Sequence, residues 1–114
     1  MNQSCIFCKI YRGEVKSTFL HKDDKCFVIR DINPKVPTHL LIIPTRHFTM
    51  LSDMKADDEG IVGHLFNVAQ EIAKKEGVAE SGYRLVINQG PNSGQDVAHL
   101  HLHVLGGRAL KTMG

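Results

Sequence analysis

Three histidines alternate with leucines in the stretch HLHLH, residues 99–103, although the 114-residue chain has only seven histidines. Successive side chains of a β-strand point to opposite faces, so on a strand these three imidazoles would share one face. Side chains two residues apart start ~7 Å from one another, which lets one His-x-His pair chelate an ion but keeps all three from converging on it. We therefore expect at least one of the three to have a different task. The plain alternative is a solvated strand face.

A second group with chemical potential is the pair Cys5 and Cys8, separated by two residues. This spacing lets two thiolates bind one tetrahedral zinc ion, but a redox pair or two unrelated thiols on a short helix remain alternatives. Cys26 lies in an apolar, strand-like run and is expected to be a small buried hydrophobic residue. A zinc site needs two more ligands, for which the candidates are His21, His39, His47, His64, His99, His101 and His103.

Hydrophobic patterning predicts the elements that position these residues. Helical spacing indicates a short helix ended by Gly13, and a long helix over residues 55–77. The expected strands are a hairpin around residues 23–25, a run over 39–43 buried on both faces between two prolines, residues 83–88, and residues 98–105. Helices placed among antiparallel strands predict an α+β domain whose sheet is covered by helices.

Composition excludes several classes of protein. The chain has a small net charge of +2, and its lysines and arginines are scattered, so we expect no binding to nucleic acid or membranes. No apolar run approaches the ~18 residues of a membrane span, and the N-terminus does not resemble a signal peptide. Three cysteines favour a reducing compartment over a disulfide scaffold. We expect a single domain over residues 1–114 in the cytoplasm, or also in the nucleus of a eukaryote.

The stretches CIFCKI, RDINPKVPTHLLIIPTRH and YRLVINQGPNSGQDVAHLHLHVLGGR resemble the histidine-triad (HIT) superfamily, and within it the HINT branch of purine nucleoside phosphoramidases. The similarity covers nearly the whole chain, and the pattern His-x-His-x-His followed by two apolar residues is highly specific. It implies the α+β HIT-like fold, with about five antiparallel strands, one long helix and one short helix. It also implies a homodimer in which two sheets join into one.

The resemblance further implies hydrolysis of nucleoside 5′-phosphoramidates. His101 would attack the phosphorus and form a covalent nucleotidyl-histidine, and water would then release the nucleoside monophosphate. His103 and His39 would donate hydrogen bonds to the phosphoryl oxygens. The implied nucleotide-binding residues are Asp31, Ile32, Ile29, Ile6, Phe7, Asn88, Gln95, Val97, His101 and His103. The implied ligands of a structural zinc ion are Cys5, Cys8, His47 and His99, the alternative being free thiols.

Two features depart from the family pattern. Asp96 stands where many HINT enzymes have a serine that assists the leaving amine; a protonated carboxyl group at this position would serve as an acid. The chain also ends in GGRALKTMG without the tryptophan-bearing tail of some relatives. Two other functions stay open: a sister HIT activity, namely dinucleoside polyphosphate hydrolysis or nucleotidyl transfer, and a non-enzymatic nucleotide-binding regulatory module.

Overall fold

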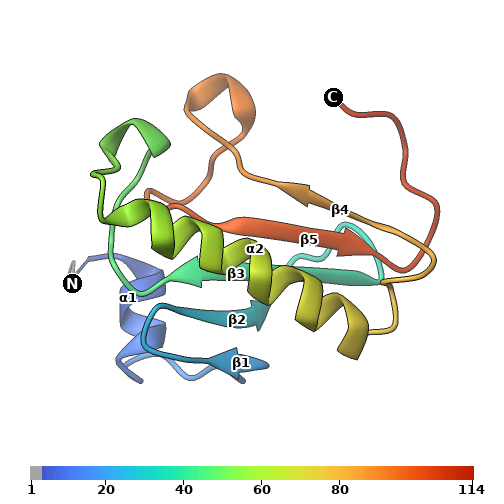
Figure 1. Cartoon of the computed structure of the whole chain (residues 1–114), viewed down its shortest axis with the longest axis horizontal. Coiled ribbons are helices and arrows are strands. Elements are labelled where there is room, and N and C mark those ends of the chain that lie inside the picture. The colour runs from blue at the N-terminus through green and yellow to red at the C-terminus, as the bar shows by residue number, and fades with distance from the viewer. Residues whose placement is uncertain (1–3) are drawn as a thin grey trace.

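The computed structural model describes residues 4–114, and Figure 1 shows its helices and strands. In chain order the elements are α1 (Ile6–Tyr11), β1 (His21–Lys22), β2 (Cys26–Arg30), β3 (Thr38–Pro44), α2 (Asp58–Lys75), β4 (Tyr83–Val86) and β5 (Leu102–Gly106). Short 3-10 turns lie at Leu51–Asp53 and Pro91–Ser93. No helix within residues 4–114 is long and apolar enough to cross a membrane.

The strands form one open sheet in the order β1-β2-β3-β5-β4, and every neighbouring pair is antiparallel. This confirms the prediction of a five-stranded antiparallel sheet. The last strand of the chain, β5, lies between β3 and β4, so the two segments that carry His39 and His103 are hydrogen-bonded neighbours. The fold thereby unites a histidine from the first half of the chain with the histidines near its end.

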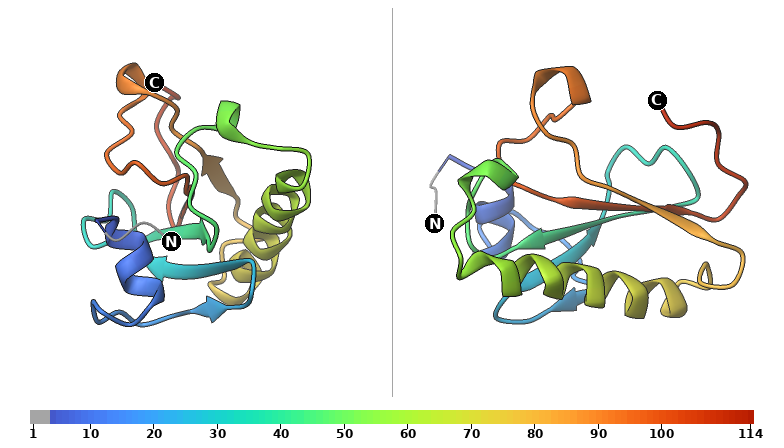
Figure 2. Two further views of the ribbon diagram at one scale, coloured as in Figure 1. Left: turned by 90° about the vertical axis from the view of Figure 1, so that its left-hand side faces the viewer. Right: turned by 45° about the horizontal axis from the view of Figure 1, so that its top comes forward.

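Helices α1 and α2 lie on opposite faces of the sheet, as the left view of Figure 2 shows. The β3 strand is buried along six of its seven residues, which confirms the expectation of a strand covered on both sides. Its alternate side chains separate the two cores: Leu40 and Ile42 pack toward α2, whereas Leu41 and Ile43 pack toward α1. His39 therefore points to the α1 side, beyond the part of that face that the short helix covers.

The prediction that the last strand begins at Ala98 is wrong, because β5 begins only at Leu102. Continuing the register past the Ile42–Leu102 pair would set Leu100 opposite Pro44, which has no N–H to donate to a partner strand. The N–H of Leu100 donates instead to the carbonyl oxygen of Phe48 at 2.7 Å. The first two histidines of HLHLH consequently precede the regular strand, and only His103 lies within it.

Candidate functional site

The side chains of His39 and His103 form a hydrogen-bonded chain whose direction is fixed by the backbone. The N–H of Lys35 donates to Nδ1 of His39 at 3.0 Å, so in the neutral ring the proton of His39 is on Nε2. That Nε2–H lies 2.9 Å from Nδ1 of His103 and 3.3 Å from a carboxylate oxygen of Asp31. His103 thus accepts at Nδ1 and carries its own proton on Nε2.

Burial keeps both of these rings neutral. Burial, together with the neighbouring rings of His101 and His39, lowers the pKa of His103 to about 4, although the carboxylates of Asp31 and Asp96 act in the opposite direction. Burial also lowers the pKa of His39, which is only 5% exposed. At neutral pH the pair therefore presents one N–H, on Nε2 of His103, as a fixed hydrogen-bond donor.

His101 has the opposite tautomer. Its Nδ1 donates to the carbonyl oxygen of His99 at 2.8 Å, so the lone pair of the neutral ring is on Nε2. The rings of His101 and His103 lie 4.8 Å apart between centroids, and Phe7 packs edge-on against His101. Nε2 of His101 thus offers a lone pair that can act as a nucleophile. Nε2 of the neighbouring His103 offers an N–H that can donate to an oxyanion.

An apolar cavity of about 200 Å³ opens beside these two rings. Five apolar side chains that were expected to bind the nucleotide gather here, since the lining of the cavity includes Ile6, Phe7, Ile29, Ile32 and Val97. Asp31 and both rings, His101 and His103, also contribute to its wall. Ile32 is 91% exposed, so its side chain forms an open rim rather than part of the core.

A more polar cavity of about 280 Å³ shares the His103 ring with the first one. Its lining includes the predicted residue Asn88, whose side-chain amide donates to the carbonyl oxygen of Ser93 at 2.7 Å. Gln95 was also expected to bind the nucleotide, but its side chain makes hydrogen bonds within the protein instead. Its oxygen accepts the N–H of Gly90, and its amide donates to the carbonyl oxygen of Thr49. Gln95 thus shapes the glycine-rich loop through its side chain.

Asp96 lies where the two cavities meet. It contributes to the lining of both, and its side chain is 79% exposed. One carboxylate oxygen lies 3.8 Å from Nε2 of His101, which is beyond hydrogen-bond distance. The carboxylate is therefore near the nucleophilic nitrogen while that nitrogen keeps its lone pair available.

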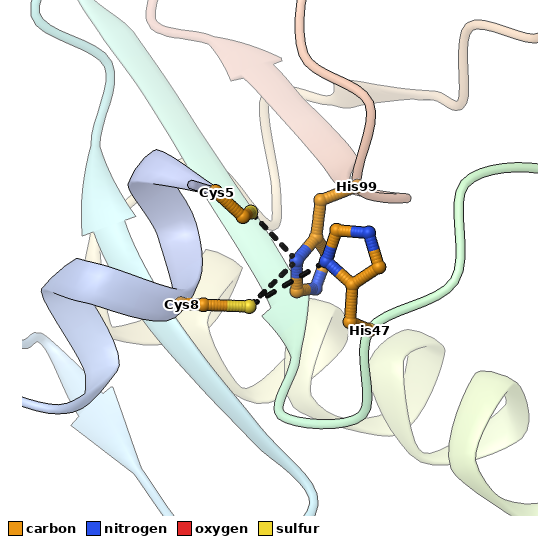
Figure 3. Close-up of side chains that lie close together, drawn as sticks. All are labelled: Cys5, Cys8, His47 and His99. Carbon is orange, nitrogen blue, oxygen red and sulfur yellow. Dashed lines mark hydrogen bonds between the residues drawn. The ribbon is translucent and has the colours of Figure 1, made fainter. Parts of the chain in front are cut away.

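The four residues proposed as metal ligands meet at the end of α1 (Figure 3). The sulfur of Cys5 lies 3.3 Å from Nδ1 of His99, and the sulfur of Cys8 lies 3.7 Å from the same nitrogen and 3.5 Å from Nδ1 of His47. Zinc bond lengths of ~2.1 Å to nitrogen and ~2.3 Å to sulfur give a tetrahedral S···N edge of ~3.6 Å. The three S···N distances are close to this edge, and all four ligand atoms lie within 4.8 Å of one another, so the cluster could hold one tetrahedral ion.

The orientation of His99 also suits metal binding. Its Nε2–H donates to the carbonyl oxygen of Pro44 at 2.8 Å, which leaves the lone pair on Nδ1, the atom that faces the thiols. The carbonyl of the same residue accepts the Nδ1–H of His101. One fully buried residue thus joins the Cys/His cluster to the orientation of the candidate nucleophile.

Comparison with known proteins identifies the family. Residues 12–110 match the HIT domain. The chain belongs to the HIT family. It is 44% identical over 113 residues to the purine nucleoside phosphoramidase of Escherichia coli K12, covering 99% of this chain and 95% of that protein. An uncharacterized HIT-like protein of Synechococcus elongatus is 44% identical over 110 residues, 96% of each chain.

Solved HIT structures have the same fold. A HIT family hydrolase from Clostridium thermocellum is 38% identical and superposes with a TM-score of 0.95, over 99% of this chain and 98% of that one. A histidine triad protein from Clostridium difficile is also 38% identical, with a TM-score of 0.94 over 100% and 99% of the two chains. The predicted HIT-like α+β fold is therefore confirmed.

Two residues of this HIT site were not found by sequence reasoning. Lys35 fixes the tautomer of His39 through its backbone N–H and also contributes its side chain to the polar cavity. Asn33 contributes to both cavities. Both lie in the turn that joins Asp31 to β3. The available signal was that these polar residues follow Asp31, which was itself expected to bind the nucleotide.

Proposed function

We propose that this HIT protein is a purine nucleoside phosphoramidase, which hydrolyses the P–N bond of nucleoside 5′-phosphoramidates. The opposed tautomers of His101 and His103 are the observation that carries the proposal. One ring offers a nucleophilic lone pair and the next a hydrogen-bond donor, at the mouth of an apolar cavity that suits a purine. The name of the Escherichia coli relative, which is similar over almost its whole length, supports the same activity.

In the first step, Nε2 of His101 attacks the α-phosphorus while the bond from phosphorus to the amine breaks. The amine takes up a proton and leaves, and the nucleotide remains covalently bound to His101. The Nδ1–H of that ring keeps its hydrogen bond to the carbonyl oxygen of His99, which stabilises the positive charge that the ring acquires. The Nε2–H of His103 donates to a phosphoryl oxygen as negative charge develops there.

In the second step, water attacks the phosphorus on the nucleotidyl-histidine. The bond to Nε2 breaks, the nucleoside monophosphate departs, and the lone pair of His101 is restored. We assign the base to the apolar cavity of Ile6, Phe7, Ile29, Ile32 and Val97. We assign Asp31, on the wall of both cavities, to the sugar, whose hydroxyl groups would donate hydrogen bonds to its carboxylate. We assign Asn88 and the backbone of the loop around Gln95 to the phosphate or the leaving group.

Asp96 is the residue we assign to the leaving amine. Its carboxyl group is exposed to solvent and lies 3.8 Å from Nε2 of His101, next to the position that the reacting phosphorus must take. In its protonated form this carboxyl group delivers a proton to the amine in the first step, and the carboxylate that remains accepts a proton from water in the second. Because the amine then leaves in its protonated form, this role makes the rate less dependent on the basicity of the leaving amine.

The test is a turnover assay with adenosine 5′-phosphoramidate, carried out in parallel with a diadenosine polyphosphate. We expect fast release of ammonia and AMP from the first compound and little cleavage of the second. His101→Ala should abolish turnover, and rapid quenching of the wild-type enzyme in alkaline denaturant, in which a P–N bond to imidazole survives, should reveal a nucleotidyl group on the peptide that contains His101. Preferential cleavage of the polyphosphate would instead support a sister HIT activity.

A non-enzymatic role makes a different prediction for the same variant. If the protein were only a nucleotide-binding regulator, His101→Ala would bind AMP and act on its partner as the wild type does. Retained function of that variant in a cellular assay would therefore refute the enzymatic proposal.

We propose zinc as the ion of the Cys5, Cys8, His47 and His99 cluster. Two thiols and two imidazoles at tetrahedral spacing are a typical donor set for structural zinc, with no coordination position left for a substrate. A bound ion would fix α1 against the segment before β5 and so hold His99 and the chain that leads to His101. Elemental analysis of the purified protein tests this, with Cys5→Ser/Cys8→Ser as the variant that should lose the ion.

We also propose that the protein is a cytoplasmic homodimer, with β4 of each chain pairing across a two-fold axis. The β4 strand is an edge of the sheet, and one row of its backbone groups has no strand partner among residues 4–114. Phe66 of α2 is a large apolar side chain that is 43% exposed in the single chain. Light scattering after size exclusion should give twice the chain mass, and a monomer would refute the assembly.

A further inference from the structure

A second group of metal-ligating side chains lies on the other face of the sheet from the HIT site. His21 belongs to β1, Asp23 to the following turn, Cys26 is the first residue of β2, and His64 lies on α2. Cys26 packs in the core between the sheet and α2, whereas the histidines of the HIT site face the α1 side. The four ligand atoms all lie within 4.8 Å of one another.

Asp23 is the centre of this group. Its Oδ2 lies 2.6 Å from Nε2 of His21, 2.7 Å from Nε2 of His64 and 3.9 Å from the sulfur of Cys26. Its other oxygen accepts the backbone N–H groups of Lys25 and Cys26 at 2.7 and 2.8 Å. The turn itself therefore holds the carboxylate in place and aims Oδ2 at the two imidazoles, as supporting hydrogen bonds do around metal ligands.

The spacing is close to that of a tetrahedral ion. Zinc bonds of ~2.1 Å to nitrogen and oxygen and ~2.3 Å to sulfur give edges of ~3.4 Å for N···O and ~3.6 Å for S···O. Binding requires each imidazole to withdraw from Asp23 by roughly 0.7 Å and the sulfur to approach by roughly 0.3 Å. The side chains of His21 and His64 are 32% and 26% exposed, so both rings have room to move without disturbing the core.

We propose that His21, Asp23, Cys26 and His64 form a second site for a divalent transition metal. Two imidazoles, a carboxylate and a thiol are the donors of zinc and cobalt sites, and they disfavour magnesium and calcium, which prefer oxygen alone. Three of the ligands come from the β1–β2 hairpin and the fourth from α2. A bound ion therefore links the long helix to the edge of the sheet, independently of the N-terminal cluster.

The test strips the full-length protein of metal with a chelator, loads it with cobalt(II), removes loosely held ions by gel filtration, and measures cobalt per chain together with the absorption spectrum. We expect about two ions per chain in the wild type and about one in Cys5→Ser/Cys8→Ser, where the second site alone remains. In that background, Cys26→Ser should remove the sulfur-to-cobalt charge-transfer band, and His64→Gln should remove the ion itself. Asp24→Asn, next to the ligand in the same turn, is the matched control and should keep both ions.

The outcomes separate this site from the zinc cluster proposed above. One ion per chain that is lost in Cys5→Ser/Cys8→Ser and unaffected by His64→Gln would overturn the second site; the group would then be a hydrogen-bonded clamp. One ion that is lost in His64→Gln and kept in Cys5→Ser/Cys8→Ser would support it while refuting the first. If the double variant does not fold, His47→Gln takes its place, since this half-buried ring contributes a single ligand to the first cluster.

Discussion

Replacing His39 by alanine isolates the contribution of a residue that acts through His103. The side chain of His39 receives the N–H of Lys35 and donates to Nδ1 of His103. Without that donor, the proton of His103 is free to occupy either nitrogen. A hydrogen bond has a net value of ~1–1.5 kcal/mol, which corresponds to a change of roughly tenfold in the ratio of the two tautomers.

This magnitude predicts an order of activities. His39→Ala should lower kcat by ~10-fold, whereas direct removal of the phosphate donor in His103→Ala should lower it by ~10²–10³-fold. His39→Gln is the informative control, because the amide nitrogen of glutamine occupies about the position of Nε2 and still donates to His103. We expect His39→Gln to recover most of the activity lost in His39→Ala, although it cannot accept from Lys35 in the same way.

Single-turnover release of AMP from adenosine 5′-phosphoramidate gives the rates, and ¹⁵N chemical shifts of His103 give its tautomer. Truncation of the buried His39 side chain should also reduce the free energy of unfolding by ~1–3 kcal/mol, so rates must be measured where each variant is folded. The reasoning is refuted if His103 remains protonated on Nε2 in His39→Ala and the rate still falls, or if His39→Gln is as slow as His39→Ala.

Three further predictions concern other parts of the site and fold. Asp96→Asn should slow turnover most for the most basic leaving amines, which a plot of log kcat against amine pKa would show as a steeper slope; an unchanged slope would remove Asp96 from the reaction. Burial lowers the pKa of His103 from its ordinary 6.5 to about 4, so between these pH values the unfolded chain binds the proton more readily than the folded protein. The contribution of His103 to stability is therefore lost as the pH falls from about 6.5 toward 4. Urea unfolding should show that the free energy of unfolding declines less between pH 7 and pH 5 in His103→Asn than in the wild type. Gly107→Ala should destabilise the protein, because the glycine has φ +94° and an added Cβ would lie 3.0 Å from Pro37 Cβ; equal melting temperatures of this variant and the wild type would contradict that expectation.

The sequence predicted the elements well wherever one local signal dominated. Two prolines bound the apolar run of β3, so its burial on both faces was readable from its composition. The amphipathic pattern of α2 was equally clear, although the helix spans Asp58–Lys75 within the wider range predicted. The insertion of β5 between β3 and β4 is a long-range pairing that periodicity does not encode.

The residues of the site were predictable mainly because whole motifs resemble the HIT family. Periodicity alone predicted that the histidines of HLHLH would share one strand, but His99 turns into the Cys/His cluster before the strand begins. Cys26 was expected to be a small buried hydrophobic residue, and it is fully buried. Its proximity to His64 depends on how α2 crosses the hairpin, which no local pattern specifies.

The point at which β5 begins explains how adjacent histidines acquire opposite tautomers. Because Pro44 has no N–H, the ladder between β3 and β5 ends at Leu102, and the carbonyl of His99 is directed to the ring of His101. That hydrogen bond places the lone pair of His101 on Nε2. Two residues further on, His103 lies inside the ladder, where its ring accepts the N–H of His39 and takes the other tautomer. The nucleophile and the oxyanion donor are thus distinguished by their positions on either side of a strand end, and Leu102 between them fixes that position by packing into the core.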